Sequence, residues 1–188
     1  SVKDAAGLSP DFPHSITVTI LPRNDPPRLT AVNDSNISAG SVSLTVYEDH
    51  WSTFFFSAED IDEDPLSYST NLTDVIPELR KNEDYIFSKG NGTIELKPRN
   101  SHVGKYRFLI SIDDGNGGMD SVRVNLTIVN KNDPPYMDKI ATKYVEQDEW
   151  LEILPMANDD DEMHGDVLTF STNFSKYLPA TLLKSNFH

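Results

Sequence analysis

Residues 104–129 read GKYRFLISIDDGNGGMDSVRVNLTIV, and their pattern sets the class of fold. Apolar residues stand at every second position on both sides of a glycine-rich centre. A period of two is typical of strands with one buried face, and Asp, Gly and Asn between two such runs predict a hairpin turn. We therefore expect two strands joined by a hairpin, with these inward residues: Tyr106, Phe108, Ile110, Ile112, Val122, Val124, Leu126 and Ile128.

The same alternation continues upstream, with turn signals at Asp64–Pro65 and Gly90–Gly92. Residues 75–80 could form at most one helical turn, and no other stretch has a convincing helical period. About seven short strands with this spacing predict an all-β, Greek-key sandwich. The further inward residues are Val42, Leu44, Val46, Phe54, Phe56, Ala58, Leu66, Tyr68, Ile94 and Leu96.

Two motifs recur in the same order, which indicates an internal repeat. ITVTILPRNDPP ends at Pro27 and VNLTIVNKNDPP ends at Pro135, 108 residues later. The segment 57–69 also resembles 156–171, pairing Asp60 with Asp159 and Asp62 with Asp161. We expect one complete unit at 26–133, the last strand of a preceding unit at 1–25 and the first half of a following unit at 134–188. The prolines at each handover predict a short, stiff joint.

Composition narrows the classes of function. The net charge of −14 argues against broad nucleic-acid binding and against attraction to an anionic membrane. It suits divalent cations or a salty exterior, or it serves solubility alone. The absence of cysteine removes disulfides and thiol chemistry, and no apolar run approaches the ~20 residues of a membrane span.

Asn-x-Ser/Thr sequons are abundant, which indicates a glycosylated protein that is extracellular or displayed on a cell surface. The alternative is a Ser- and Thr-rich β protein in which this spacing arises by chance. The candidate glycosylation sites are Asn33, Asn36, Asn71, Asn91, Asn125 and Asn173.

These motifs together resemble tandem cadherin-like repeats of the dystroglycan type, which are common in microbial surface proteins. The resemblance covers essentially the whole chain. It rests on the two NDPP joints and on YED at 47–49, DID at 60–62, GTIELKP at 92–98, VGKY at 103–106 and SIDDGNGG at 111–118. It implies immunoglobulin-like sandwiches used outside the cell for adhesion, spacing or self-association. The partners would be other proteins, copies of the chain or surface glycans.

Cadherins also bind calcium between repeats, and the resemblance implies a ligand set for each joint. Calcium takes six to eight oxygens, and acids gathered closely repel one another without a cation. We expect any ion to act as a mechanical brace. The first joint would use Asn24, Asp25, Asp60, Asp62 and Asp114, and the second would use Glu48, Asn132, Asp133, Asp159 and Asp161.

Three departures from the family pattern weaken this site. Residues 98–100 read PRN where calcium-binding cadherins have Asp-Arg-Glu, so one carboxylate is lost. An Asn is missing before the joint prolines, and Pro22 and Asn130 replace the first Asp of each joint. A dissociation constant of ~10⁻⁴ to 10⁻³ M would follow. Alternatively, these acids are turn formers and edge-strand charges.

No catalytic arrangement stands out, so we expect no enzyme activity. The five histidines lack metal-site spacing, and there is no Gly-x-Ser-x-Gly elbow. The preferred function is a stiff extracellular stalk or adhesion module. The rival is an accessory region, a spacer or carbohydrate contact, of a large secreted polysaccharide-degrading enzyme. Trp51 and Trp150 could stack on sugars or cover the end of a sandwich core.

Overall fold

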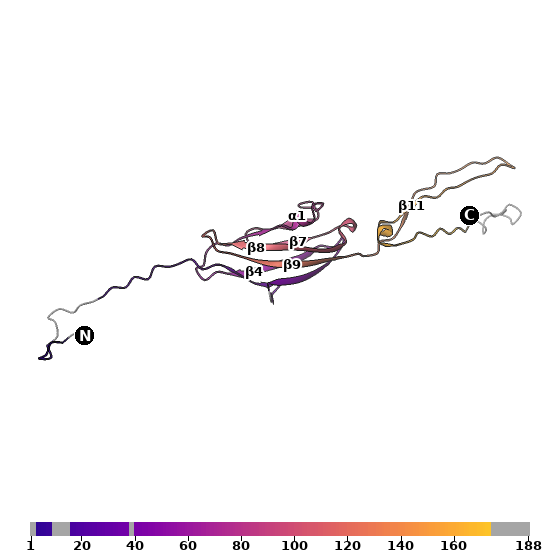
Figure 1. Ribbon diagram of the computed structural model, residues 1–188. Helices are drawn as coiled ribbons and strands as arrows, with labels where there is room; N and C mark the ends of the chain where they lie inside the picture. Colours follow the sequence, from indigo (N-terminus) through magenta and orange to yellow (C-terminus); the bar gives the residue numbers. More distant parts are fainter. Residues whose placement is uncertain (1–2, 9–15, 38–39, 174–188) are drawn as a thin grey trace.

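The computed structural model describes residues 3–8, 16–37 and 40–173. Its central body is a sandwich of two sheets (Figure 1). One sheet has the order β2-β1-β4-β7-β6, formed by Ser35–Asn36, Arg28–Val32, Ser52–Glu59, Thr93–Leu96 and Tyr85–Phe87. The other has the order β3-β9-β8-β5, formed by Ser41–Tyr47, Met119–Val129, Gly104–Asp113 and Ser67–Thr70.

The predicted hairpin is confirmed as β8 and β9. The two strands pair antiparallel from Gly104 opposite Ile128 to Asp113 opposite Met119. The inward residues of both strands are buried except Tyr106, which is half-buried. The Asp113 carboxylate accepts a hydrogen bond of 2.7 Å from the Gly115 N–H, which is the Asx-turn role that Asp takes at a hairpin.

Strand β3 pairs with β9 in parallel, from Ser41 opposite Arg123 to Tyr47 opposite Val129. Alternation in the sequence predicts which face of a strand is buried and says nothing about its neighbour, so this pairing was not foreseen. The two sheets have the strand grouping of immunoglobulin-like sandwiches. The expected all-β, immunoglobulin-like fold is therefore confirmed.

The strands predicted from alternation between Val42 and Ile128 are present, and β1, β2 and β6 add to the expected set. Residues 16–25, which were predicted to belong to the last strand of a preceding unit, form no strand, because no described segment pairs with them. The helical turn was placed too late: α1 spans Leu72–Val75 and not residues 75–80. Leu72 is fully buried, which fixes the turn there, and Pro77 disfavours helical geometry in the residue before it. Among the described residues, nineteen buried apolar side chains form the core, with Phe56, Phe108 and Ile110 among the deepest.

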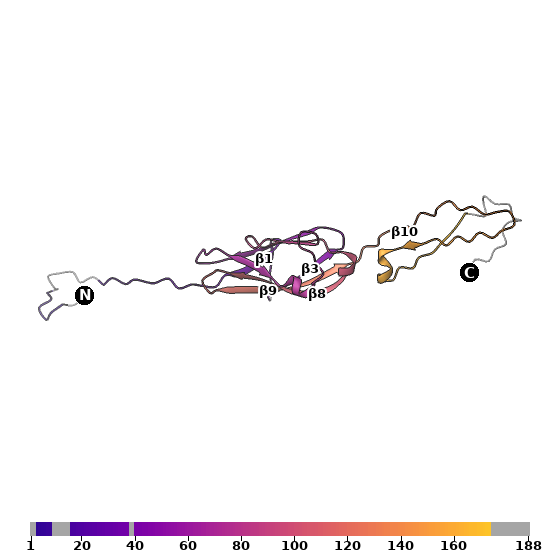
Figure 2. The same cartoon turned by 90° about the horizontal axis from the view of Figure 1, so that it is seen from above.

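The chain reaches the sandwich at one end and leaves it at the opposite end (Figures 1 and 2). Beyond the sandwich, β10 (Tyr136–Met137) pairs antiparallel with β11 (Ala157–Asn158), and a 3₁₀ turn, η2, spans Asp160–His164. The boundaries at 25 and 133 stay predictions, and residues 1–2, 9–15 and 174–188 of the flanking units lie outside the described part. No helix in the described part is long and apolar enough to span a membrane.

Candidate metal-binding joints

Acidic and amide side chains gather at both ends of the sandwich, around the two NDPP segments. We define the first joint as Asn24, Asp25, Asp60, Asp62, Asp64, Asp114 and Asn116. We define the second joint as Glu48, Asn100, Asn130, Asn132, Asp133, Asp159, Asp161 and Asp166.

At the first joint, the Asp-x-Asp turn holds the incoming backbone. The Asp25 N–H donates to Asp62 Oδ2 at 2.7 Å, and the Asp62 N–H donates to Asp60 Oδ1 at 2.8 Å. Asp60 Oδ2 is buried and has no hydrogen-bond partner. The turn therefore fixes the chain by one carboxylate and leaves a free acceptor on the other.

Asp114 completes the first joint from the end of β8. Its carboxylate accepts 2.8 Å from the Asn24 amide, 2.7 Å from the Asn116 N–H and 2.9 Å from the Gly118 N–H. The Asn24 hydrogen bond is the main cause that lowers the pKa of Asp114, against the opposing effect of burial. Carboxylate oxygens of Asp60, Asp64 and Asp114 lie within 4.8 Å of one another, so negative charge is concentrated here.

Gly118 explains why the predicted glycine turn is needed at this joint. A Cβ at residue 118 would clash with the Asp114 carboxylate and lie 2.8 Å from Pro26 Cα. The hairpin must therefore pass this point without a side chain.

The second joint repeats the backbone pattern of the first. The Asp133 N–H donates to Asp161 Oδ2 at 2.5 Å, and the Asp161 N–H donates to Asp159 Oδ1 at 2.9 Å. Asp159, Asp161 and Asp166 bring carboxylate oxygens within 4.8 Å of one another. Asp161 is fully buried, because residues of the central sandwich also cover this joint. We call these residues, Glu48 and Asn100, the second wall.

Glu48, at the end of β3, forms part of that wall and is also fully buried. The Lys131 N–H donates to Glu48 Oε1 at 2.7 Å, while Oε2 has no partner. Burial is the main cause that raises the pKa of Glu48; the Lys131 hydrogen bond opposes it, and the charge of Asp161 adds to the rise. A buried carboxylate with a free oxygen beside another carboxylate is stabilised when a cation lies between them.

Asn100 forms the rest of the wall, from the 3₁₀ turn η1 (Asn100–His102). Its amide nitrogen donates to the Asp160 carbonyl and lies 3.5 Å from Asp161 Oδ1. Its Oδ1 is buried without a partner, as is that of Asn130, which directly precedes Lys131. Both residues stand where the sequence departs from the calcium-binding pattern, and both offer a neutral oxygen in place of a carboxylate.

The structure gathers most of the predicted ligands. At the first joint Asn24, Asp60, Asp62 and Asp114 come together through their side chains, whereas Asp25 takes part through its backbone N–H. At the second joint Glu48, Asp159 and Asp161 come together, and Asp133 likewise takes part through its backbone N–H. Asn132 does not join them: it is exposed, and its amide donates to the Asp133 carbonyl at 3.1 Å. Sequence reasoning missed Asp64, Asn116, Asp166, Asn100 and Asn130; the first three stand within seven residues of a predicted acid, which was the available signal.

The oxygen-only donor set and the orphaned acceptors fit calcium, a hard cation that binds carboxylate and amide oxygens. At the second joint, calcium would bind the carboxylates of Asp159, Asp161 and Asp166, which lie close together, and the unpartnered oxygens of Glu48, Asn100 and Asn130 are further candidates. It would supply the positive charge that this buried cluster lacks. At the first joint, Asp60, Asp64 and Asp114 are the corresponding candidates.

The predicted glycosylation sites differ in accessibility. Asn33, Asn36, Asn91 and Asn173 are exposed, and Asn71 and Asn125 are half-buried. Asn71 Oδ1 accepts a 2.7 Å hydrogen bond from the Leu109 N–H. Ser38 and Ser175, which complete two of the sequons, lie outside the described residues.

Two sheets grouped in this way, with paired joints at their ends, define an immunoglobulin-like module. The chain belongs to the bacterial Ig domain family, which it matches over residues 24–127. No curated protein matches the sequence. Neither the match nor the fold confirms the narrower cadherin-like, dystroglycan-type assignment.

Solved structures resemble the chain in part. A nucleoside hydrolase-related protein of Saccharophagus degradans is 18% identical (56% of this chain, 26% of that chain, TM-score 0.43). A proposed α-galactosidase/melibiase of Bacteroides fragilis is 14% identical (55% and 17%, TM-score 0.37). The Ig1-2 module of a Drosophila receptor protein tyrosine phosphatase is 13% identical (61% and 57%, TM-score 0.37). The matched region spans about a quarter or less of the two bacterial proteins, and these likenesses say nothing about what this chain binds.

Proposed function

We propose that this chain is a non-catalytic, extracellular spacer and adhesion module in which consecutive units are held end to end and calcium braces the joint. The observation that carries the proposal is that Glu48 and Asp161 are both fully buried at the second joint, near enough for the charge of Asp161 to raise the pKa of Glu48. Two buried carboxylates without a cation are costly. An ion between them would turn repulsion into a mechanical link between the units.

The backbone supports the same mechanism. Pro134 and Pro135 restrict the segment between the units, and Asp133 ties that segment to Asp161 through its N–H. The chain also leaves the sandwich opposite to where it enters (Figure 1). Units connected in this way extend as a rod and display binding surfaces to other proteins, to further copies of the chain or to surface glycans.

Titration calorimetry of the chain with calcium tests this proposal. We expect saturable binding with a dissociation constant of ~10⁻⁴ to 10⁻³ M. At about 10 mM calcium and a constant of about 1 mM, binding would stabilise the folded state by about 1.4 kcal/mol. Absence of both binding heat and a rise in melting temperature would overturn the calcium brace.

Magnesium is the matched control ion. It is smaller and requires near-ideal octahedral geometry, which Asn100 and Asn130 do not readily complete. We expect magnesium to bind more weakly than calcium. Equal responses to both ions would indicate a diffuse acidic surface instead of a joint site.

Surface display is supported by the sequons and by the family. Bacterial Ig-like domains are typical of surface or secreted proteins, and four sequon Asn residues are exposed. Expression through a eukaryotic secretory pathway, followed by mass spectrometry before and after glycosidase treatment, would show which are used. We expect Asn33, Asn36 and Asn91 to be modified ahead of Asn71 and Asn125, and the reverse order would contradict this part of the proposal.

The second candidate is an accessory region of a secreted polysaccharide-degrading enzyme. An open hollow on β8 and β9, lined by polar and apolar side chains, favours it, because small-ligand sites combine apolar surface with a few well-placed polar groups. A hydrolase domain encoded beside these repeats would support this role. Further repeats followed by a surface anchor would support the stalk.

A further inference from the structure

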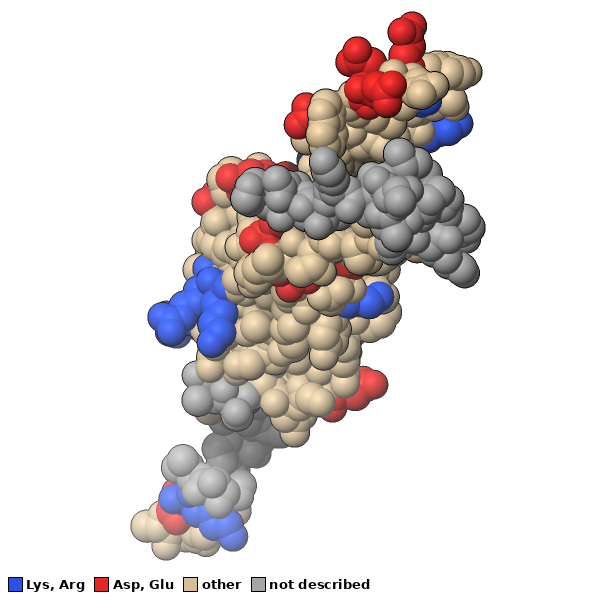
Figure 3. Space-filling view, turned by 90° about the vertical axis from the view of Figure 1, so that its right-hand side faces the viewer, with Lys and Arg blue, Asp and Glu red and all other residues tan. Residues whose placement is uncertain are grey.

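The outer face of the β3-β9-β8-β5 sheet concentrates positive charge in a chain whose net charge is −14. Lys105 and Arg107 alternate along β8, and Arg123 lies on β9; all three are exposed. Figure 3 shows one group of Lys and Arg side chains on a flank of the molecule, with further Lys and Arg side chains scattered elsewhere on the visible surface. We call Lys105, Arg107 and Arg123 the basic face.

Strand register brings these three cations together. Arg107 stands opposite Asn125, and Arg123 stands opposite Leu109, the next outward residue of β8. Alternate residues of a strand are ~7 Å apart and neighbouring strands are ~5 Å apart. The cations therefore lie along ~14 Å of the sheet, a length comparable to two or three sugar rings.

Acidic residues do not neutralise the basic face. The ion pairs of the described part, Arg80–Glu83 and Arg99–Asp84, involve none of its members. The acids of β8 and β9, Asp113 and Asp120, lie near the hairpin. Asp74 of α1 and Glu78 are the acids nearest the adjoining surface: Asp74 directly precedes Val75, and the charge of Glu78 adds to the rise in the pKa of Tyr106 that burial causes. No ion pair joins either acid to the basic face.

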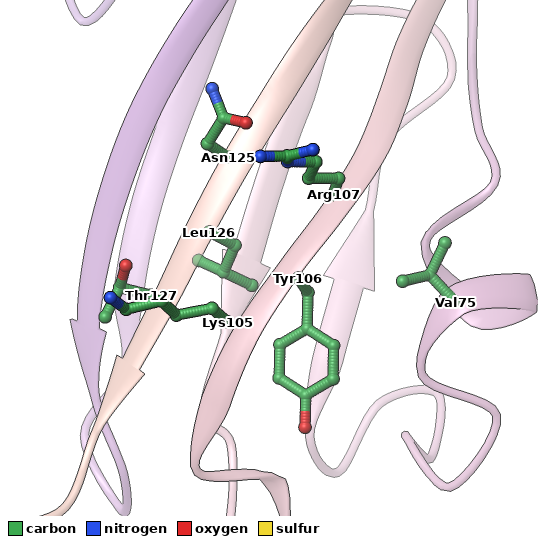
Figure 4. Close-up of a pocket in the computed structure, with 7 residues that line it drawn as sticks. All are labelled: Val75, Lys105, Tyr106, Arg107, Asn125, Leu126 and Thr127. Atoms are coloured by element: carbon green, nitrogen blue, oxygen red, sulfur yellow. The ribbon is translucent and has the colours of Figure 1, made fainter.

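A hollow of about 670 Å³ opens beside the basic face. Lys105, Arg107, Asn125 and Thr127 line it, with Tyr106 and Val75 at its edge (Figure 4). In Figure 4 the Arg107 guanidinium extends toward Asn125 and Lys105 extends toward Thr127. Charged donors thus stand next to neutral hydrogen-bonding groups.

The surrounding residues decide which kind of polyanion fits. Across the sheet the basic face continues into Ser41, Ser43 and Thr45 of β3, and its exposed aromatic residue, Tyr47, lies at the strand end. Protein interfaces depend on buried aromatic anchors, and single-stranded nucleic acids need aromatic platforms. A field of hydroxyl, amide and cationic groups instead matches a charged sugar chain.

We propose that the basic face binds a sulfated polysaccharide. Guanidinium groups are weakly hydrated, and a sulfate ester, whose charge is spread over three oxygens, is a better match for them than a compact carboxylate. Asn125 and Thr127 would hydrogen-bond the sugar hydroxyls. This inference rests on the proposed extracellular location and is independent of calcium.

The Asn125 sequon lies inside the same surface, and a glycan there would cover it. Its amide points back to the Val42 carbonyl at 3.5 Å. Asn125 is half-buried, whereas Asn33, Asn36 and Asn91 are exposed. We therefore assign this position to ligand contact and not to glycosylation.

The test is binding of the whole chain, produced without N-glycans, to immobilised dextran sulfate at about 0.15 M salt. EDTA is included, so calcium bridges cannot contribute and failure of the calcium proposal would not affect the result. A variant with Lys105→Gln, Arg107→Gln and Arg123→Gln is compared with a control carrying Lys89→Gln, Lys139→Gln and Lys143→Gln, which has the same net charge. Thermal unfolding confirms that both variants fold.

We expect saturable binding that weakens at least about 10-fold in the basic-face variant and less than about twofold in the control, because specific contacts outweigh net charge. Equal weakening in both variants, or no saturable binding, would overturn the proposal. Polygalacturonate or double-stranded DNA binding as tightly as dextran sulfate would overturn the sulfate assignment, and binding to uncharged dextran would remove the role of charge.

Discussion

The two joints share one backbone device and differ in what covers it. In each, an NDPP backbone N–H donates to the second carboxylate of an Asp-x-Asp turn, from Asp25 to Asp62 and from Asp133 to Asp161. Asp62 is exposed, whereas Asp161 is fully buried. The same local motif therefore produces a solvated turn at one end of the sandwich and a buried charge cluster at the other.

The difference comes from the second wall. Glu48 and Asn100 enclose the second joint from the sandwich side. By the predicted boundaries, residues 1–25 hold only the last strand of the preceding unit, so the positions that would correspond to Glu48 and Asn100 at the first joint fall outside that range. The short Asp-x-Asp motif therefore forms the turn by itself. How much buried negative charge a cation would neutralise depends on the neighbouring unit. The strength of a calcium site in such repeats should follow the enclosing residues more than the Asp-x-Asp turn itself.

The largest expected effect is that of Glu48→Gln. Without calcium the variant should be more stable than the wild type near pH 7, because it removes a buried carboxylate whose pKa is raised. With calcium it should lose the stabilisation of about 1.4 kcal/mol expected for the wild type. Melting temperatures with and without calcium measure both effects.

Glu95→Gln is the matched control, since Glu95 is a half-buried residue of β7 that belongs to neither joint. It should keep the full calcium response. An unchanged calcium response in Glu48→Gln would assign the cation to the first joint. The claim that enclosure strengthens the calcium site would then be wrong.

The sequence predicted the Asp-x-Asp turns of both joints. It could not predict which residues enclose the second joint. Asp60, Asp62, Asp159 and Asp161 recur at a fixed spacing, so their turns could be read directly. In the sequence, Asn100 indicates only that a carboxylate ligand is missing. Its role at the joint depends on a contact with Asp160, 60 positions away. Burial across such a separation follows from packing between units and leaves no local pattern.

In the fold, too, local features could be predicted from the sequence, whereas features that depend on distant residues could not. Alternation predicted the inward faces of β8 and β9 residue by residue, because the period of a strand is local. The parallel partner of β9 could not be predicted, because either edge position of β3 would bury Leu44 and Val46 equally well.

A second test makes the same substitution at both joints. Asp161→Asn should speed hydrogen exchange of the Asp133 amide by about 10-fold or more, because a charge-assisted hydrogen bond is about twice as strong as a neutral one and this one is buried. Asp62→Asn should change exchange of the Asp25 amide by about threefold or less, since the exposed bond competes with water. Amide exchange followed by NMR gives both values, and equal effects would show that burial does not distinguish the joints.

Calcium affinity should depend on pH differently at the two joints. The pKa of Glu48 lies above its ordinary 4.5, so protons compete with calcium at the second joint as the pH falls through that raised value. The pKa of Asp114 lies below 3.8, so the first joint keeps this charge to lower pH. Calorimetry in steps from about pH 7 to pH 4.5 should show the second-joint heat disappearing first.

Glu48→Gln provides the check on that assignment. The pH dependence above 4.5 should shrink in this variant, because the group that binds the competing proton is gone. A pH profile identical to that of the wild type would assign the competing proton to another residue.

The smallest expected effect concerns His102, which supports η1 and therefore only the second joint. Its Nδ1 accepts the Arg99 N–H at 3.0 Å, and it is almost fully buried. Burial lowers its pKa below 6.5, more than the nearby Asp84 raises it. The neutral form therefore contributes stability that is present above pH 6.5 and is lost as the pH falls through the lowered pKa.

Acidification from pH 7 should therefore loosen the second joint while the first is unaffected, because a proton on Nδ1 breaks the bond that shapes η1 next to Asn100. The readout is amide exchange at Asp133 compared with Asp25, without calcium. His102→Gln should flatten the pH dependence at Asp133. His164 Nε2 lies 3.3 Å from the Asn100 carbonyl, so His164→Gln measures the separate contribution of the other histidine at this joint. Parallel loosening of both joints in the wild type would mean that the acid effect acts on the whole sandwich and not through η1.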